Sequence, residues 1–275
     1  MIKLRETTTV LILFILFINM SCAQQKKDVS KPNILFILSE DMSTDLECYG
    51  MAAVKTPVLN QLAATGVQYM NAYGNNSICS PSRATILTGQ YSHVNGVKIL
   101  AGGLPPKHPT IAGVLQRGGY QTSIIGKWHL NFQYIDPITN TAISKKSKKH
   151  LPPIGATIPD GPIHRGFDYY HGFHHAKDMK AVIENDEVIL YDDEINMLPR
   201  LTNKSVAYIN QQAKNNNGKP FFLYVPLGSP HTPILPSKEW QGKSGMGDYA
   251  DFVMQTDATV GAITKALKDN GLSEN

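Results

Sequence analysis

Two kinds of hydrophobic pattern alternate along the chain. Short, uninterrupted apolar runs predict buried strands, whereas apolar residues repeated every three or four positions predict helices. The predicted strands cover residues 33–39, 67–73, 121–125 and 221–225, and the predicted helices cover residues 56–66, 81–88, 110–117, 201–214 and 249–268. This alternation predicts an α/β fold with a central, mostly parallel sheet flanked by helices.

Residues 133–200 interrupt the alternation. They are rich in Pro, His and Asp and show no sustained periodicity, so we expect them to form irregular loops over one edge of the sheet. The basic stretch 145–150 (KKSKKH) lies among them. It is typical of a solvated loop, and the alternative is a rim that attracts anions.

The first residues have the pattern of an export signal. Lys3 and Arg5 precede the apolar run 10–18, and the small residues 21–23 follow it before a polar segment. This order predicts a signal peptide over residues 1–23 and a linker over 24–31, with the folded domain beginning at residue 32. The run is too short for a stable membrane span, so the predicted location is periplasmic or secreted. Lipid attachment at Cys22 is the weaker alternative, because Asn19 fits it poorly.

Composition narrows the function classes. Charged residues make up 17% of the 275 residues and the net charge is +4, with no basic face interleaved with aromatic residues, so nothing favours nucleic-acid binding. The chain has three cysteines, and beyond the signal region only Cys48 and Cys79 remain. These two can form one disulfide in an oxidising compartment, but they do not make a disulfide-stapled scaffold.

Polar segments directly follow three predicted strands. They are Glu40-Asp41, the stretch 126–129 (GKWH) and the stretch 229–231 (SPH). The carboxyl ends of parallel strands meet at the same edge of a sheet, where α/β proteins bind their ligands. We therefore expect these three segments to share one site.

Cys79 lies in the stretch 76–89 (NSICSPSRATILTG) and has two interpretations. An isolated cysteine is usually buried and inert. Here, however, Pro81 suits the first turn of a helix and Arg83 follows Cys79 by one turn on the same face. Cys79 is therefore expected at a helix N-terminus that favours an anion. The loop between Cys79 and Arg83 is too short for the phosphate cradle of a thiolate phosphatase.

The segment 79–83 (CSPSR) resembles the active-site motif of type I sulfatases, which belong to the alkaline-phosphatase-like superfamily. Four other segments resemble blocks of the same family in the same order: 33–41, 126–130, 165–172 and 229–233. The resemblance extends from residue 32 to the end of the chain. It implies an alkaline-phosphatase-like fold and hydrolysis of sulfate esters, with a sulfated carbohydrate as the expected substrate.

The resemblance also implies a modified nucleophile. In this family a maturation enzyme oxidises the cysteine that corresponds to Cys79 to formylglycine, whose hydrate attacks the sulfur of a sulfate ester and later releases sulfate. A divalent cation, usually calcium, assists and takes oxygen ligands. Glu40, Asp41 and residue 79 are the metal ligands that this chain would contribute.

Four more residues receive roles from the resemblance. Arg83 would hold the hydrated aldehyde and the carboxylates on the metal side, and Lys127 would neutralise the sulfate charge. His129 would assist removal of a proton from the hydrate. His231 would face the leaving-group oxygen as a hydrogen-bond donor or general acid. His171, His174 and His175 are further candidates for the substrate pocket, with a surface loop as the alternative.

The chain departs from the family pattern in two ways. Glu40 stands where the family usually has an aspartate. Family members also continue into a strand that ends in Asp, Asn or His, and Gly, whereas Asp269-Asn270-Gly271 follows a helical pattern and is interpreted as a helix-end turn. The chain thus corresponds to the N-terminal part of a sulfatase with only some of the metal ligands. Two alternative functions remain open: a phosphate or phosphonate monoester hydrolase of the same superfamily, and an inactive fragment that binds sulfated glycans.

Overall fold

The structure is a computed structural model that describes residues 31–143, 151–215 and 218–273. The chain divides into two units, residues 1–31 and 32–275, and almost everything described belongs to the second unit. The predicted signal peptide, nearly all of the linker and the whole basic stretch 145–150 therefore lie outside the described residues. Within the described residues, no helix is both long and apolar enough to cross a membrane.

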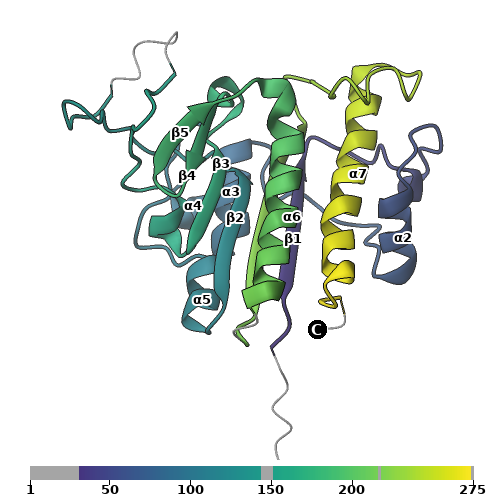
Figure 1. Cartoon of the computed structure of the whole chain (residues 1–275), viewed down its shortest axis with the longest axis horizontal. Helices are drawn as coiled ribbons and strands as arrows, with labels where there is room; N and C mark the ends of the chain where they lie inside the picture. The colour runs from purple at the N-terminus through teal and green to yellow at the C-terminus, as the bar shows by residue number, and fades with distance from the viewer. Residues whose placement is uncertain (1–30, 144–150, 216–217, 274–275) are drawn as a thin grey trace, which may run out of the picture. The chain divides into compact units, whose positions relative to one another are not determined.

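A six-stranded sheet forms the centre of the second unit (Figure 1). In spatial order its strands are β1 (Ile34–Glu40), β6 (Phe221–Pro230), β2 (Gln121–Lys127), β3 (Tyr169–Phe173), β4 (Ala181–Glu184) and β5 (Glu187–Tyr191). The first four strands pair in parallel, and β4 and β5 add an antiparallel hairpin. The predicted mostly parallel α/β sheet is confirmed.

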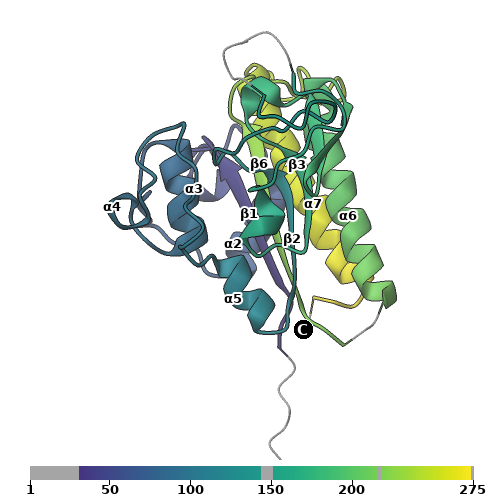
Figure 2. The ribbon, with the colours of Figure 1, turned by 90° about the vertical axis from the view of Figure 1, so that its left-hand side faces the viewer.

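Helices cover both faces of this sheet (Figure 2). On one face lie α3 (Cys79–Thr88) and α5 (Ile111–Arg117), and on the other lie α6 (Met197–Asn215) and α7 (Asp248–Asp269). The apolar residues of β6 alternate between the two cores, with Phe222 and Tyr224 facing α3 and α5 and with Phe221, Leu223 and Val225 facing α6 and α7. An uninterrupted apolar strand therefore serves two hydrophobic cores at once.

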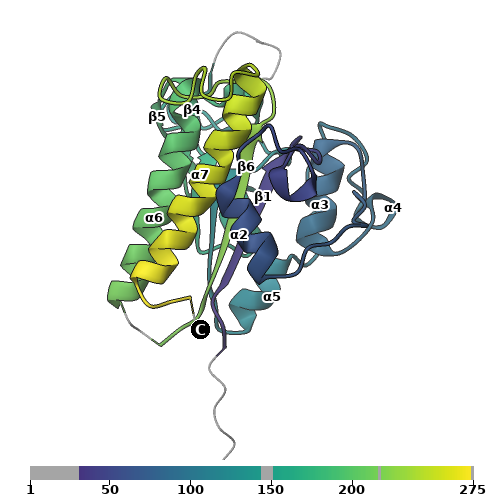
Figure 3. The same ribbon diagram turned by 90° about the vertical axis from the view of Figure 1, so that its right-hand side faces the viewer.

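Two further α-helices, α2 (Pro57–Thr65) and α4 (Ser92–Asn95), are described. The N-terminus of α2 lies against α7 (Figure 3), and the backbone N–H groups of Val58 and Leu59 donate to the Asp257 carboxylate on α7 at 3.2 and 2.8 Å. The N-cap residue Thr56 makes no capping hydrogen bond with its side chain. Asp257, on another helix, therefore takes the place of an N-cap side chain for α2. The four-residue helix α4 follows α3.

Two of the sequence predictions about secondary structure are wrong. Residues 67–73 form no strand, and the side chains of Val67, Tyr69 and Tyr73 are mostly exposed, because no described strand pairs with this segment. Residues 133–200, predicted to be irregular, contain β3, β4 and β5 as well as the start of α6. Strands of four or five residues are too short to show a periodic pattern.

The helix-end interpretation of residues 269–271 is confirmed. Helix α7 ends at Asp269, Asn270 is its C-cap, and Gly271 has a φ of +66°. This left-handed backbone suits glycine and ends the helix.

Candidate active site

The three polar segments predicted to meet do so at the carboxyl edge of the sheet. Glu40 is the last residue of β1, Lys127 is the last residue of β2, and His231 follows β6 directly. Ser39 on β1 donates its hydroxyl proton to the Ser229 carbonyl on β6 at 2.8 Å, which ties two of these strand ends together. The parallel order of the strands therefore collects side chains that are almost 200 residues apart in sequence.

Cys79 is the first residue of α3, as the proline and glycine positions predicted. The next residue, Ser80, is buried and its hydroxyl lies 2.7 Å from the carbonyl oxygens of both Leu100 and His129. Arg83, one turn along, is also buried and donates from Nη1 to the Lys127 carbonyl at 2.8 Å. These bonds attach the helix N-terminus to the end of β2 and fix the direction of the Cys79 side chain.

A buried carboxylate with two cations lies beside Cys79. Lys127 Nζ donates to Glu40 Oε2 at 2.5 Å, and Arg83 Nη2 lies 3.4 Å from the same oxygen. Burial by itself would raise the pKa of Glu40, but the charges of Arg83 and Lys127 and the Lys127 hydrogen bond outweigh it and lower that pKa to about 2. Glu40 is therefore ionised at neutral pH.

The other oxygen of this carboxylate has no partner. Glu40 Oε1 is buried and makes no hydrogen bond within the described residues. A buried carboxylate oxygen without a donor is costly, and a bound cation would satisfy it. The donor set at this point therefore fits a hard divalent cation that prefers oxygen ligands.

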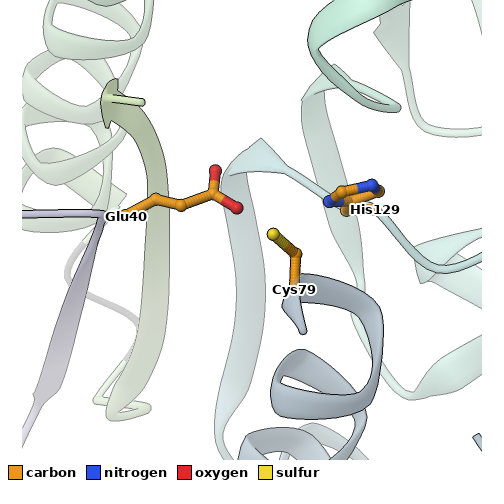
Figure 4. A group of neighbouring side chains, drawn as sticks. All are labelled: Glu40, Cys79 and His129. Carbon is orange, nitrogen blue, oxygen red and sulfur yellow. The ribbon is translucent and has the colours of Figure 1, made fainter. Parts of the chain in front are cut away.

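Cys79, Glu40 and His129 come together in one group (Figure 4). One ligand atom of each lies within 4.8 Å of the others. Burial, followed by the charge of Glu40, raises the pKa of the Cys79 thiol. The thiol is thus protonated at neutral pH, which makes unmodified Cys79 a poor nucleophile.

His129 is a neutral imidazole in this group. Burial, followed by the charges of Lys127 and Arg83, lowers the pKa of His129 to about 3. Its Nδ1 is buried without a hydrogen-bond partner, and its backbone has a φ of +56°. A neutral histidine can accept a proton at a free ring nitrogen. The His129 backbone N–H donates to the His174 carbonyl at 2.7 Å, which holds the residue against the loop that follows β3.

Asp41 lies apart from this group. Its side chain is 66% exposed, and its Oδ2 is 3.7 Å from His231 Nε2. Of the three predicted metal ligands, Glu40 and Cys79 are thus adjacent, whereas Asp41 is paired with His231 at the rim. The role of all three as metal ligands stays a prediction. Cys48 and Cys79 are both free thiols, so the optional disulfide is not formed.

A cavity of about 470 Å³ opens over these residues. Its lining includes four of the predicted site residues, Cys79, Lys127, His129 and His231. The loop after β3 supplies His174, His175, Ala176 and Lys177, and the remaining lining residues are Leu100, Ala101 and Asn131. Of the three further histidine candidates, His174 and His175 therefore reach the cavity. His171 lies along a different hollow, next to Arg200 and Lys204 of α6.

Lys177 is the charged residue among the cavity residues that the sequence reasoning missed. Its position four residues after the end of β3 would have indicated it, but β3 itself was not predicted. With β3 recognised, the loop 174–177 becomes a fourth polar segment at the carboxyl end of a parallel strand.

Comparison with known proteins agrees with this geometry. A family model described as sulfatase matches residues 32–275. The N-acetylgalactosamine-6-sulfatase of Homo sapiens is 29% identical over 262 residues, covering 89% of this chain and 48% of that protein. The chain thus spans about half the length of the curated relatives that it matches.

Two solved structures extend the comparison. A structure from a study of glycosaminoglycan metabolism by Bacteroides thetaiotaomicron has a TM-score of 0.74 and 25% identity, and the match covers 90% of this chain and 61% of the other. A protein in complex with its substrate D-glucosamine-2-N,6-O-disulfate has a TM-score of 0.57 and 26% identity, over 77% of this chain and 37% of the other. The family match across the whole second unit, with the sulfatase-like fold, shows that the chain belongs to the sulfatase family.

Proposed function

We propose that this chain carries the nucleophile side of a sulfatase that hydrolyses sulfate esters of carbohydrates, with residue 79 acting after its conversion to formylglycine. The observation that carries the proposal is the position of Cys79. It lies at the first turn of α3, within 4.8 Å of Glu40 and His129, on the wall of a cavity. The raised pKa of the thiol supports a precursor role, because a cysteine used directly would have a lowered pKa.

Each neighbouring side chain has a task that its surroundings support. Lys127, which lines the cavity, neutralises charge on a bound sulfate, and buried Arg83 holds Glu40 and the α3 N-terminus in place. His129, whose Nδ1 has no hydrogen-bond partner within the described residues, accepts a proton from the hydrated residue 79. His231, at the rim, donates a hydrogen bond or proton to the departing alcohol oxygen, with Asp41 beside it.

A divalent cation, calcium by family resemblance, completes this proposal. Glu40, Asp41 and an oxygen of modified residue 79 would hold it, and the unpartnered Glu40 Oε1 supports that assignment. When bound, the cation stabilises negative charge on the sulfate oxygens.

The proposal includes maturation and export. A formylglycine-generating enzyme is the expected partner of the segment 79–83, and the N-terminal pattern supports export to the periplasm or secretion after cleavage following Ala23, with lipid anchoring at Cys22 as the alternative. The sulfatase relatives named above support a sulfated carbohydrate as the substrate.

Maturation is tested by co-expression with a formylglycine-generating enzyme and mass spectrometry of the peptide that carries residue 79. We expect loss of the thiol and reaction with a carbonyl probe at residue 79. Cys48, the other described cysteine, is the internal control and should stay a thiol. A persistent thiol at residue 79 would contradict the proposal.

Activity is tested on the same preparation with an aryl sulfate and the matching aryl phosphate. We expect sulfate ester hydrolysis to dominate, and Cys79→Ala to lower it by roughly a thousandfold. Faster turnover of the phosphate would instead favour a phosphate or phosphonate monoester hydrolase. Binding of sulfated glycans without turnover of either ester would favour the inactive fragment.

A further inference from the structure

The cavity has a second polar wall that the proposed chemistry does not use. It is formed by residues 174–177 of the loop between β3 and β4, which spans residues 174–180, and it begins beside His129. The rings of His129 and His175 meet edge to face with centroids 5.8 Å apart. A group bound at this loop would therefore be a near neighbour of an ester bound at residue 79.

His175 lines the cavity, and the protein contacts one of its two ring nitrogens. Its Nδ1 lies 2.8 Å from Asp178 Oδ1 and 3.0 Å from the Lys177 backbone nitrogen, so the protein occupies that side of the ring. Asp178 Oδ2 also lies 3.2 Å from His174 Nδ1, and the ring of buried His174 packs against Phe132 in a tilted arrangement, with ring centroids 4.3 Å apart. Within the described residues, Nε2 of His175 has no hydrogen-bond partner, so it is the nitrogen available to a ligand.

Lys177 adds a cation whose charge is not neutralised locally. Its side chain is exposed on the cavity wall, and no ion pair to it exists within the described residues. The nearby Asp178 carboxylate is already shared by His174 and His175. Lys180, three residues along, differs because its Nζ lies 3.7 Å from Asp193. Lys177 is therefore the lysine of this loop that is free to bind an anion at the cavity.

The rest of the lining is mostly apolar. Leu100, Ala101 and Ala176 line the cavity together with the polar residue Asn131. Apolar side chains suit the C–H face of a sugar ring, whereas Lys177 and His175 suit a negatively charged substituent on that ring. The ligand that matches the whole cavity is thus an anionic saccharide.

We propose that Lys177 and His175 form a subsite for a second anionic group on the substrate, so that preferred substrates carry a sulfate or carboxylate in addition to the sulfate ester that is hydrolysed. This inference rests on the proposed sulfatase function and names its substrate class. Lys177 supplies the charge and His175 Nε2 supplies a directed hydrogen bond. Because Lys177 is exposed, its contribution is partly screened by salt.

The test is a ratio of two specificity constants. We would measure kcat/KM of the matured protein for D-glucosamine-2-N,6-O-disulfate and for D-glucosamine-6-sulfate, and repeat the pair for Lys177→Ala, Lys177→Arg and Lys180→Ala. We expect the wild type to prefer the disulfate and Lys177→Ala to reduce that preference about tenfold, as for loss of one charge-assisted hydrogen bond. Lys177→Arg should keep most of the preference, and the matched control Lys180→Ala should keep all of it.

A second pair of probes separates the two kinds of anion. A 6-sulfated disaccharide with a free uronate is compared with its methyl ester, which removes only the carboxylate charge. A Lys177-dependent preference in the sulfate pair assigns the subsite to a second sulfate, and one in the uronate pair assigns it to a carboxylate. A wild type that shows no preference in either pair, or a preference that Lys177→Ala leaves unchanged, overturns the inference.

Equilibrium binding to the unmatured thiol form distinguishes this inference from the proposed function. Calorimetric titration with the same saccharides needs no turnover, and Lys177→Ala should weaken binding of the doubly charged probe about tenfold. Lys177-dependent binding without hydrolysis after maturation would support the subsite and reject the sulfatase activity. Hydrolysis of the monosulfated sugar without Lys177-dependent binding of the second anion would support the sulfatase activity and reject the subsite.

Discussion

Glu40 is the residue on which the electrostatics of the site depend. Its carboxylate lies between Lys127, which is 1% exposed, and Arg83, which is 3% exposed. Two buried cations without a counter-ion would be costly, so Glu40 has a structural function besides its predicted role as a metal ligand. The extra methylene relative to the family's usual aspartate does not prevent the contact with either cation.

Replacing this carboxylate should destabilise the protein measurably. We expect Glu40→Gln to lower the free energy of unfolding by about 3–5 kcal/mol, because it leaves buried charges unpaired. Glu40→Asp keeps the negative charge, so it should lower the free energy of unfolding by less than Glu40→Gln does. Urea unfolding at pH 7.5 measures both, with Glu239→Gln as the control, since Glu239 is 76% exposed and lies 3.9 Å from Lys243. A loss below about 1 kcal/mol for Glu40→Gln would contradict this account.

At the scale of elements, strands β2, β3 and β6 leave no room for a side chain at two glycines near the site. Gly126 on β2 and Gly172 on β3 are register partners, and a Cβ at Gly172 would lie 1.9 Å from the Gly126 carbonyl oxygen. A Cβ at Gly126 would lie 2.2 Å from the Pro226 carbonyl oxygen on β6. These glycines permit the packing that places Lys127 at the cavity.

A methyl group at this point should therefore be damaging. We expect Gly172→Ala to lower the free energy of unfolding by about 3 kcal/mol, since backbone atoms must move to admit it. Gly113→Ala in α5 is the matched control, because its Cβ would meet only ordinary contacts at 3.5 Å and beyond. Inside a helix that change should stabilise by about 0.5–1 kcal/mol. Equal effects of the two substitutions in thermal or urea unfolding would contradict the packing argument.

At the scale of the whole molecule, buried histidines link stability to pH. His171 on β3 is 3% exposed, and burial, followed by the charge of Lys204, lowers its pKa to about 4 from the usual 6.5. The folded state holds His171 neutral while the unfolded chain binds a proton more readily. Its contribution to stability is thus complete above pH 6.5 and is lost as the pH falls toward 4.

The variant His171→Phe should reduce this acid sensitivity. From pH 7.5 to pH 5, we expect protonation linked to His171 to lower the free energy of unfolding of the wild type by about 2 kcal/mol. The total decrease over this pH range should be smaller in the variant by the same amount. Urea unfolding at the two pH values gives the difference, and the pH 7.5 measurement corrects for any change in packing. An identical pH dependence of the wild type and the variant would show that His171 does not titrate in this way.

Much of this protein is determined by local sequence. The buried strands β2 and β6, the partly buried strand β1, the helix that begins at Cys79 and the turn at Gly271 follow from apolar runs, proline and glycine, because each depends on a few neighbouring residues. The meeting of Glu40, Lys127 and His231 also followed from sequence, since parallel strands bring their carboxyl ends to one edge.

Tertiary structure alone decided the rest. Residues within a stretch without periodicity form β3, β4 and β5 because they pair with neighbouring strands. Residues 67–73 form no strand, since no described strand pairs with them. Only the folded chain sets Asp41 apart from Glu40, leaves Glu40 Oε1 buried without a partner, and brings Lys177 to the cavity wall. The physical reason is that burial, charge pairing and strand partnership depend on distances between residues far apart in sequence, which a local pattern does not contain.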